Sequence, residues 1–216
     1  MLNRNELINK LADNLKKYSP VIIIGNSGTG KTHMLKALMN SLNDKKARIL
    51  TSEEIFISII EGIKNGANKS EWKNSLHEQT VLLIDDIDYL KNKDHTQEEL
   101  LLVLKSSNKP VVATSEKPLN NECFSNAFIS YFSEGACVYL DTLDLDTQKE
   151  YLRKCIFKNA LDLTEDATEW IYKQNFPDYA AIQGFVKTVH LYSRQNQQTT
   201  LGECQKLLFQ IKQHWL

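Results

Sequence analysis

The feature that most constrains the fold is an apolar run that passes directly into a glycine-rich loop. Residues 21–24 read Val-Ile-Ile-Ile, and residues 25–32 read Gly-Asn-Ser-Gly-Thr-Gly-Lys-Thr. This order predicts a buried strand, a phosphate-binding P-loop of the form G-x-x-x-x-G-K-T, and then a helix. Glycines at positions 25, 28 and 30 allow backbone conformations that turn successive N–H groups toward a phosphate, and the helix N-terminus adds its dipole.

We therefore expect this loop to bind a nucleotide. Lys31 would reach the β- and γ-phosphates, and Thr32 would offer its hydroxyl to Mg²⁺. The candidate cofactor-binding residues are Gly25, Asn26, Ser27, Gly28, Thr29, Gly30, Lys31, Thr32 and His33, of which His33 is expected to be a packing residue. The alternative, a glycine turn beside a surface lysine, does not account for the strand before the loop and the apolar helix after it.

A second apolar run, at residues 80–84, ends in Asp85 and Asp86. A carboxylate at the tip of a buried strand can hold Mg²⁺, and a neighbouring acid can orient or deprotonate the attacking water. Asp85, with Thr32, is therefore the candidate metal ligand, and Asp86 is assigned to the water. Thr114 ends a further strand, where its hydroxyl could sense the γ-phosphate. Lys31, Asp86 and Thr114 are the candidate catalytic residues. The alternatives are a solvated strand end for the two acids and a turn-forming role for Thr114.

Strands alternate with helices in the first two thirds of the chain. Further strands are expected at 48–50, 111–114 and 137–140. Pairs of the form Thr-x-x-Glu predict helix starts at Thr51, Thr96 and Thr147. This alternation predicts an α/β fold with a parallel sheet and ligands at the carboxyl ends of its strands. Beyond residue 141 only helical patterns follow, so we expect an α/β nucleotide-binding domain at 1–161 and a small all-helical domain at 162–216.

Composition adds mild limits. The formal net charge is -1, so a contact with nucleic acid would need a local basic patch. The 4 cysteines show no C-x-x-C spacing and are expected to be buried thiols in a reducing compartment. The sequence shows neither a signal peptide nor an apolar segment long enough to cross a bilayer, which predicts a soluble cytoplasmic protein without a membrane partner.

Taken together, these motifs resemble the AAA+ module (domain III) of the bacterial DnaA family of replication initiators and their shorter, regulatory Hda-type relatives. The resemblance covers nearly the whole chain. The matching segments are Tyr18-Ser19-Pro20, residues 30–35, Thr51-Ser52-Glu53-Glu54, residues 83–90, Asn92-Lys93, residues 96–99, Ser133-Glu134-Gly135, residues 144–147, and Leu163 to Gly184.

The resemblance implies a five-stranded AAA+ sheet with flanking helices and a helical lid. It also implies binding of ATP or ADP with Mg²⁺ and a role in the initiation of DNA replication or its regulation in the bacterial cytoplasm. The partners implied are DnaA, a helicase, possible single-stranded DNA, and a sliding clamp. The family's double-stranded DNA-binding domain would begin where this sequence stops, so specific duplex recognition is not expected of it.

Three departures from the family pattern concern arginines. Tyr131 stands where the family carries an arginine that acts on a neighbouring subunit, Ala180 stands at the lid arginine, and Gln148 stands at a third. Because an arginine finger contributes about 10³–10⁵ to the rate, we expect at most a weak ATPase. The alternative is a degenerate, nucleotide-stabilised interaction module, adaptor-like or helicase-loader-like, without significant ATPase activity. A small P-loop kinase is disfavoured because its lid would need arginines, and the chain has only four.

Two further surface patterns leave alternatives open. Lys64, Lys69 and Lys73 with Trp72 could line a path for single-stranded DNA, but a solvated helix rim with an inward tryptophan is the favoured interpretation. Residues 205–209, Gln-Lys-Leu-Leu-Phe, faintly resemble peptides that dock on sliding clamps. A plain amphipathic terminal helix is the favoured interpretation there.

Overall fold

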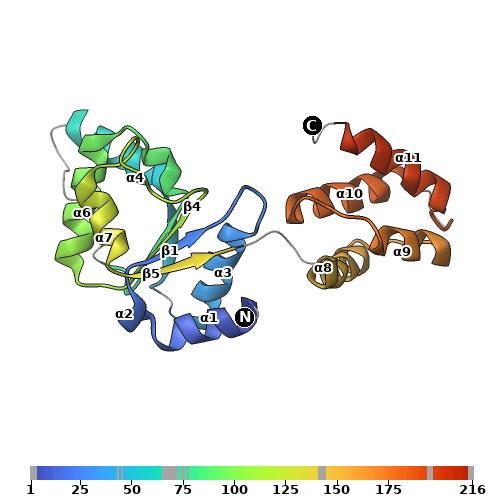
Figure 1. Cartoon of the computed structure of the whole chain (residues 1–216), viewed down its shortest axis with the longest axis horizontal. Coiled ribbons are helices and arrows are strands. Elements are labelled where there is room, and N and C mark those ends of the chain that lie inside the picture. The colour runs from blue at the N-terminus through green and yellow to red at the C-terminus, as the bar shows by residue number, and fades with distance from the viewer. Residues whose placement is uncertain are drawn as a thin grey trace. The chain divides into compact units, whose positions relative to one another are not determined.

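The computed structural model describes residues 4–42, 44, 46–64, 73, 76, 78–140, 145–193 and 197–213. Contacts divide the chain into two compact units, one of Met1–Asn26 with Gly30–Leu140 and one of Ser27–Thr29 with Asp141–Leu216. The first is the α/β unit and the second is the helical unit (Figure 1). The division falls between Leu140 and Asp141 rather than between residues 161 and 162. The reason is that helix α8 (Leu145–Lys158) buries Leu152 and Cys155 in the helical core.

Among the described residues, five strands form one parallel sheet, as the sequence predicted. They are β1 (Val21–Ile24), β2 (Arg48–Thr51), β3 (Leu82–Asp85), β4 (Val111–Ser115) and β5 (Ala136–Tyr139), in the order β2-β3-β4-β1-β5. β1 therefore lies between β4 and β5, and Ile24 is in register with Ser115. Because all pairs are parallel, the carboxyl ends of β1, β3 and β4 meet at one edge of the sheet.

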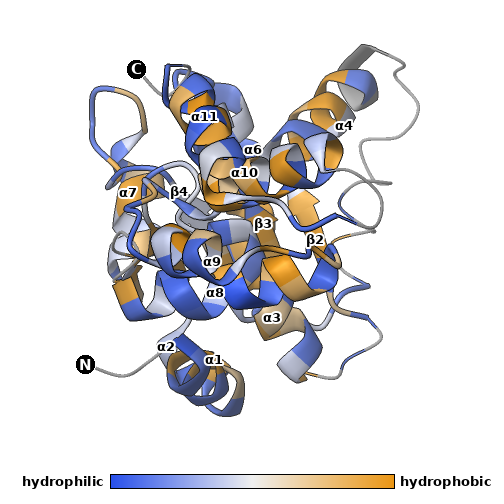
Figure 2. Cartoon of the chain, turned by 90° about the vertical axis from the view of Figure 1, so that its right-hand side faces the viewer, coloured by the Kyte–Doolittle hydropathy of each residue, from blue (hydrophilic) through white to orange (hydrophobic). Residues whose placement is uncertain are grey.

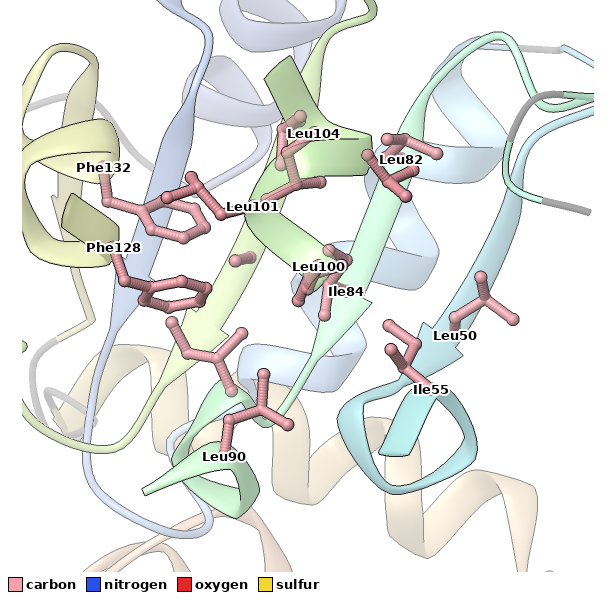
Figure 3. Packing of buried hydrophobic residues seen from close by; sticks show 14 of the residues in the cluster. Leu50, Ile55, Leu82, Ile84, Leu90, Leu100, Leu101, Leu104, Phe128 and Phe132 are labelled. Atoms are coloured by element: carbon pink, nitrogen blue, oxygen red, sulfur yellow. The ribbon is translucent and has the colours of Figure 1, made fainter. Parts of the chain in front are cut away.

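Helices cover both faces of this sheet (Figure 1). Their bounds are α1 (Arg4–Asp13), α2 (Leu15–Tyr18), α3 (Lys31–Leu42), α4 (Ser52–Lys64), the short 3₁₀ helix η1 (Ile87–Leu90), α6 (Asp94–Ser107) and α7 (Asn126–Ser133). Alternate residues of β1 enter different cores: Ile23 packs with α1 and α3, whereas Ile22 packs with α4, α6 and α7. This burial on both faces explains why the strand is wholly apolar. Figure 3 shows the second of these cores, with Ile84, Leu100 and Phe128 packed together.

The helical unit has a hydrophobic core of its own. It contains α8, α9 (Glu165–Tyr172), α10 (Tyr179–Tyr192) and α11 (Leu201–Lys212). Phe176 and Phe185 are buried at its centre, with ring centroids 5.5 Å apart. A capping box of Thr200 and Glu203 starts α11. In the part of the chain that the structure describes, no helix is both long and apolar enough to cross a membrane.

Helix α11 decides between the two interpretations of the terminal segment. Leu207 and Leu208 are buried in the helical core, and Phe209 is 67% exposed. Figure 2 shows hydrophobic and hydrophilic residues together on this helix. The segment is therefore the amphipathic helix that the sequence favoured, with its leucines used for packing.

One of the three predicted helix starts is confirmed. The Glu54 backbone N–H donates to the Thr51 hydroxyl at 3.1 Å, and the Glu54 carboxylate accepts the Thr51 N–H at 2.8 Å. The starts at Thr96 and Thr147 are wrong, because α6 already begins at Asp94 and α8 is already helical at Leu145. The N-cap position of α6 is held by Lys93, and Thr96 lies within the first turn with its side chain buried.

Candidate functional site

The glycine-rich loop leaves β1 at Ile24 and enters α3 at Lys31. Gly28 and Gly30 have φ values of 78° and 93°, the left-handed region that glycine tolerates best. Gly25 is fixed to the neighbouring strand, because its N–H donates to the Ser115 carbonyl at 3.1 Å. The Met34 N–H donates to the Gly30 carbonyl at 2.8 Å, so the hydrogen bonding of α3 begins at the last glycine. The loop thus has the strand-turn-helix context of a P-loop.

The Lys31 ammonium folds back over this loop. Its Nζ donates to the Gly25 carbonyl at 2.6 Å and to the Asn26 carbonyl at 3.1 Å. The positive charge is therefore held at the mouth of the loop, where a phosphate oxygen could replace a carbonyl as its acceptor. His33, in contrast, is exposed on α3, so the prediction that it packs is wrong. The physical reason is its position: the inward-facing residues that follow it are Met34 and Leu35.

Three polar side chains from different elements meet beside the loop. Thr32 Oγ1 of α3 donates to Asp85 Oδ2 at 2.7 Å, and Thr114 Oγ1 of β4 donates to Asp85 Oδ1 at 2.5 Å. Asp85 is 9% exposed at the end of β3, and Thr114 is fully buried. The structure thus brings together Thr32, Asp85 and Thr114, which are far apart in the sequence. The signal that predicted this was the position of each residue at the carboxyl edge of a parallel sheet.

Asp86 occupies an unusual backbone conformation directly after β3. Its φ and ψ are 58° and 61°, and its N–H donates to the Thr114 hydroxyl at 2.8 Å. Its side chain is exposed. The pKa of Asp86 is raised by partial burial and by the nearby negative charges of Asp88 and Asp85, against a lowering effect of Lys31. An exposed carboxylate with a raised pKa is suited to accept a proton.

Asp88 has a structural use that the sequence did not indicate. Its carboxylate accepts the Glu116 N–H at 2.5 Å and forms an ion pair with Lys91 at 2.7 Å. It therefore connects η1 to the end of β4, on the same side of the sheet as Asp86. This contact holds the two loops at the carboxyl edge together.

The side chains of Thr32 and Asp85 offer oxygen atoms, the type of ligand that Mg²⁺ binds. Mg²⁺ prefers oxygen ligands, commonly uses one or two protein groups, and completes its shell with water and phosphate oxygens. Within the described ranges, no group of three or more histidine, cysteine or acidic side chains could hold a metal by itself. A bound phosphate would add its oxygens to those of Thr32 and Asp85.

The three positions at which the resemblance led us to expect arginine hold the neutral side chains of Tyr131, Ala180 and Gln148. Tyr131 of α7 is half-buried and packs edge-to-face on Phe132, with ring centroids 5.3 Å apart. Burial, and to a smaller extent Glu134, raises the pKa of Tyr131 to about 12, so its phenol is neutral. Ala180 is exposed in the first turn of α10.

Gln148 is buried in the helical unit. It is 2% exposed, and its amide accepts the Phe176 N–H and donates to the Phe176 carbonyl, each at 3.1 Å. Its Nε2 also donates to Asn175 at 3.1 Å. These bonds fix the turn before α10, which gives Gln148 a structural role within the helical unit.

The basic residues considered for single-stranded DNA fall largely outside the described residues. Lys69 and Trp72 lie there, and the side chain of Lys64 is not described. Lys73 forms an ion pair with Glu99 at 2.8 Å.

A different basic and aromatic group was missed by the sequence reasoning. Lys93 Nζ lies 4.4 Å from the ring centroid of Tyr89 and 5.4 Å from that of Phe56, and the two rings meet edge-to-face at 5.8 Å. No spacing rule joins these residues, because they come from α4, η1 and the start of α6.

Comparison with known proteins identifies the family. The family model for the bacterial DnaA ATPase domain matches residues 4–139. The chain belongs to this family. The chromosomal replication initiator protein DnaA of Mesoplasma florum is 30% identical to this DnaA-family chain over 198 residues, covering 87% of it and 45% of that protein. DnaA of Buchnera aphidicola subsp. Cinara cedri is 29% identical over 213 residues, covering 94% and 48%. The chain thus spans about half the length of the curated relatives it matches.

Solved structures of DnaA share the fold. Domain III of the Thermotoga maritima replication initiation protein DnaA matches with a TM-score of 0.85 at 24% identity, covering 94% of this chain and 89% of that one. AMPPCP-bound DnaA from Aquifex aeolicus matches with a TM-score of 0.74 at 25% identity, covering 88% and 61%. A replication initiator DnaA bound to AMPPCP and single-stranded DNA matches with a TM-score of 0.74 at 25% identity, covering 87% and 60%.

Proposed function

We propose that this chain is a DnaA-type AAA+ module that binds ATP or ADP with Mg²⁺ and acts in the initiation of DNA replication or in its regulation. The observation that carries the proposal is the pair of hydrogen bonds from Thr32 and Thr114 to Asp85, because it joins the P-loop helix to two strand ends at one point. Family membership supports it, as do the DnaA structures that hold AMPPCP.

Each group has a task that its chemistry suits. The loop amides of residues 25–30 would surround the phosphates, and the Lys31 ammonium would exchange its two carbonyl acceptors for phosphate oxygens. Thr32 and Asp85 would hold Mg²⁺, which when bound neutralises phosphate charge. Asp86 would accept the proton of an attacking water.

Hydrolysis by this site is expected to be slow. Tyr131 is a neutral, half-buried side chain, and Ala180 carries no charge, so neither supplies the positive charge with which an arginine offsets negative charge on a transferring phosphoryl group. Loss of an arginine finger alone costs about 10³–10⁵ in rate. Lys31 still supplies its positive charge to the loop, so we expect nucleotide binding to be retained although hydrolysis is slow.

A second candidate is an adaptor in which nucleotide only stabilises the fold. The packing of Tyr131 against Phe132 favours it, because this position serves the core of the α/β unit. Single-turnover hydrolysis with and without added DnaA separates the two candidates. A rate that DnaA increases supports a regulated ATPase, whereas a rate near zero in both cases supports the adaptor. A helicase is the other protein partner that we propose for this chain in the bacterial cytoplasm.

Single-stranded DNA is the nucleic acid that we propose as a partner. The group of Phe56, Tyr89 and Lys93 supports the proposal, because aromatic rings stack on bases and a lysine neutralises the backbone. One of the related structures is a replication initiator DnaA bound to AMPPCP and single-stranded DNA. Titration of a labelled oligonucleotide against wild type and Lys93→Ala tests it. Lys105→Ala, which changes an exposed lysine of helix α6, is the control. Equal affinities for all three proteins would count against this surface.

The central experiment is a nucleotide titration of Lys31→Ala. Because Lys31 provides charge-assisted hydrogen bonds, its loss is expected to weaken binding of fluorescent ADP by about 10- to 100-fold. Lys36→Ala is the matched control, since Lys36 is an exposed lysine on the same helix α3. Unchanged affinity in Lys31→Ala, with the wild type binding, would refute the assignment of the P-loop.

A further inference from the structure

The Thr114 hydroxyl makes two hydrogen bonds within the protein, one as donor and one as acceptor. A threonine hydroxyl has one proton to donate and lone pairs to accept with. The proton goes to Asp85 Oδ1 at 2.5 Å, and the oxygen accepts the Asp86 N–H at 2.8 Å. The residue is 0% exposed within β4. Its only proton is therefore directed at a carboxylate, whereas a phosphate sensor needs a proton to donate to phosphate.

The two hydroxyls that hold Asp85 differ in their surroundings. Thr32 donates to Oδ2 from the exposed first turn of α3, so its bond can be exchanged for another partner at little cost. Thr114 donates to Oδ1 from a fully buried position, where a lost hydrogen bond would leave polar groups unsatisfied. Thr114 is thus the permanent partner of the carboxylate, and Thr32 is the replaceable one.

The Thr114 hydroxyl also holds the backbone of the next residue, because it accepts the Asp86 N–H. Asp86 has positive φ, a conformation that costs energy for a residue with a Cβ and needs support from its surroundings. The Thr114 hydroxyl supplies that support by accepting the Asp86 N–H. One side chain therefore fixes the rotation of the Asp85 carboxylate and the direction in which the chain leaves β3.

We propose that Thr114 is a positioning residue, which orients Asp85 toward Mg²⁺, and not the γ-phosphate sensor that its place at a strand end suggested. This inference rests on the proposed nucleotide-binding function. A positioning residue and a phosphate sensor differ in their effects on nucleotide binding. A positioning residue changes the contribution of Mg²⁺ to binding equally for ADP and ATP, whereas a sensor changes the affinity for ATP relative to ADP.

The test measures the affinity of fluorescent ADP and of a non-hydrolysable ATP analogue, each in Mg²⁺ and in EDTA. The proteins are wild type, Thr114→Val, Thr114→Ala and Thr114→Ser. Loss of a group that orients a metal ligand typically weakens metal binding by about 10- to 100-fold. We expect Thr114→Val to lose about tenfold in affinity for both nucleotides in Mg²⁺ and to match wild type in EDTA. Thr114→Ser, which keeps the hydroxyl, should restore the Mg²⁺ effect.

Each other outcome has a distinct meaning. A loss confined to the ATP analogue, or one that persists in EDTA, would overturn positioning in favour of phosphate sensing. Unchanged Mg²⁺ dependence in Thr114→Val and Thr114→Ala would overturn this inference alone. Wild-type protein that binds neither nucleotide would overturn the proposed function and this inference with it. Thr114→Ala provides the readout if Thr114→Val does not fold, because it removes the hydroxyl without adding an apolar branch beside the carboxylate.

Discussion

Gly135 has no room for a side chain. A Cβ built on it would lie 1.7 Å from the carbonyl oxygen of Pro20 and 2.6 Å from its carbonyl carbon. The neighbouring bonds leave little freedom to move, because the Ala136 N–H donates to the same Pro20 carbonyl at 3.0 Å and the Val111 N–H donates to the Ser19 hydroxyl at 2.8 Å. The segment before β1 is thus fixed against the starts of β4 and β5.

We expect Gly135→Ala to destabilise the protein by about 2–4 kcal/mol, because backbone must shift to admit the methyl group. The free energy of unfolding, measured by urea denaturation followed by circular dichroism, checks this. Gly202→Ala is the control: nothing lies within 4 Å of the Cβ built there, and alanine favours the helix. A stability of Gly135→Ala equal to that of wild type would show that the segment can move.

The residues of the candidate site show what the sequence could and could not predict. The proximity of Thr32 and Asp85 followed from a P-loop and a strand-end acid in a parallel sheet. The bonds of Thr114 could not be predicted, because the sequence gives the end of a strand but not the direction of a hydroxyl. The exposure of His33 was missed because its helical phase depends on where α3 begins.

At the level of elements, α4 shows how a short motif becomes a helix end. Thr51 and Glu54 exchange hydrogen bonds, and these lower the pKa of Glu54, chiefly through the Thr51 backbone N–H and further through the Thr51 hydroxyl and the charge of Arg48. A pKa lower in the folded than in the unfolded protein stabilises the fold above the unfolded value of 4.5. The stabilisation is lost as the pH falls through the lowered pKa.

We therefore expect Glu54→Gln to reduce the free energy of unfolding by about 0.3–1 kcal/mol at neutral pH. The difference from wild type should begin to shrink as the pH falls below the unfolded pKa of 4.5, and it should vanish below the lowered pKa of the folded protein, where wild-type Glu54 is also uncharged. Denaturation curves at several pH values measure it. Glu53→Gln, which removes an exposed acid from the same helix turn, should show a smaller and less pH-dependent change. A constant difference across the pH range would contradict the ionised cap.

The wrong helix starts have a common physical cause. Thr-x-x-Glu is short and occurs inside helices as well as before them, and only tertiary packing distinguishes the two. At Thr96 the side chain is buried, and the neighbouring Gln97 donates to the Leu90 and Cys123 carbonyls at 2.8 and 3.1 Å. The N-cap of α6 is Lys93, three residues before the cap that the motif indicated.

At the scale of the whole molecule, the chain has separate cores. Those of the α/β unit lie on the two faces of the sheet, and that of the helical unit surrounds Phe185. The sequence predicted the order of the units because strands stop before residue 141. It placed their boundary too late, since the amphipathic pattern of α8 does not reveal which core the helix joins.

Phe185→Ala is expected to weaken the helical unit selectively. Removing a buried phenylalanine costs about 3–5 kcal/mol, and the loss falls on contacts among α8–α11. Hydrogen exchange should become faster in these helices and stay unchanged in β1, β3 and β4. Phe157→Ala, at a position that is 88% exposed on α8, is the control and should leave exchange unchanged. Equal acceleration in both units would show that they unfold as one.

The central place of β1 in the sheet has a consequence for synthesis of the chain. Val21 pairs with Val112 on one side and with Ala136 on the other, so both partners are translated long after the strand itself. At a translation rate of about 5–20 residues per second, β4 is synthesised roughly 5–20 seconds after these four apolar residues. A newly made fragment that ends before β4 would expose this strand, and it should depend on a chaperone to avoid aggregation.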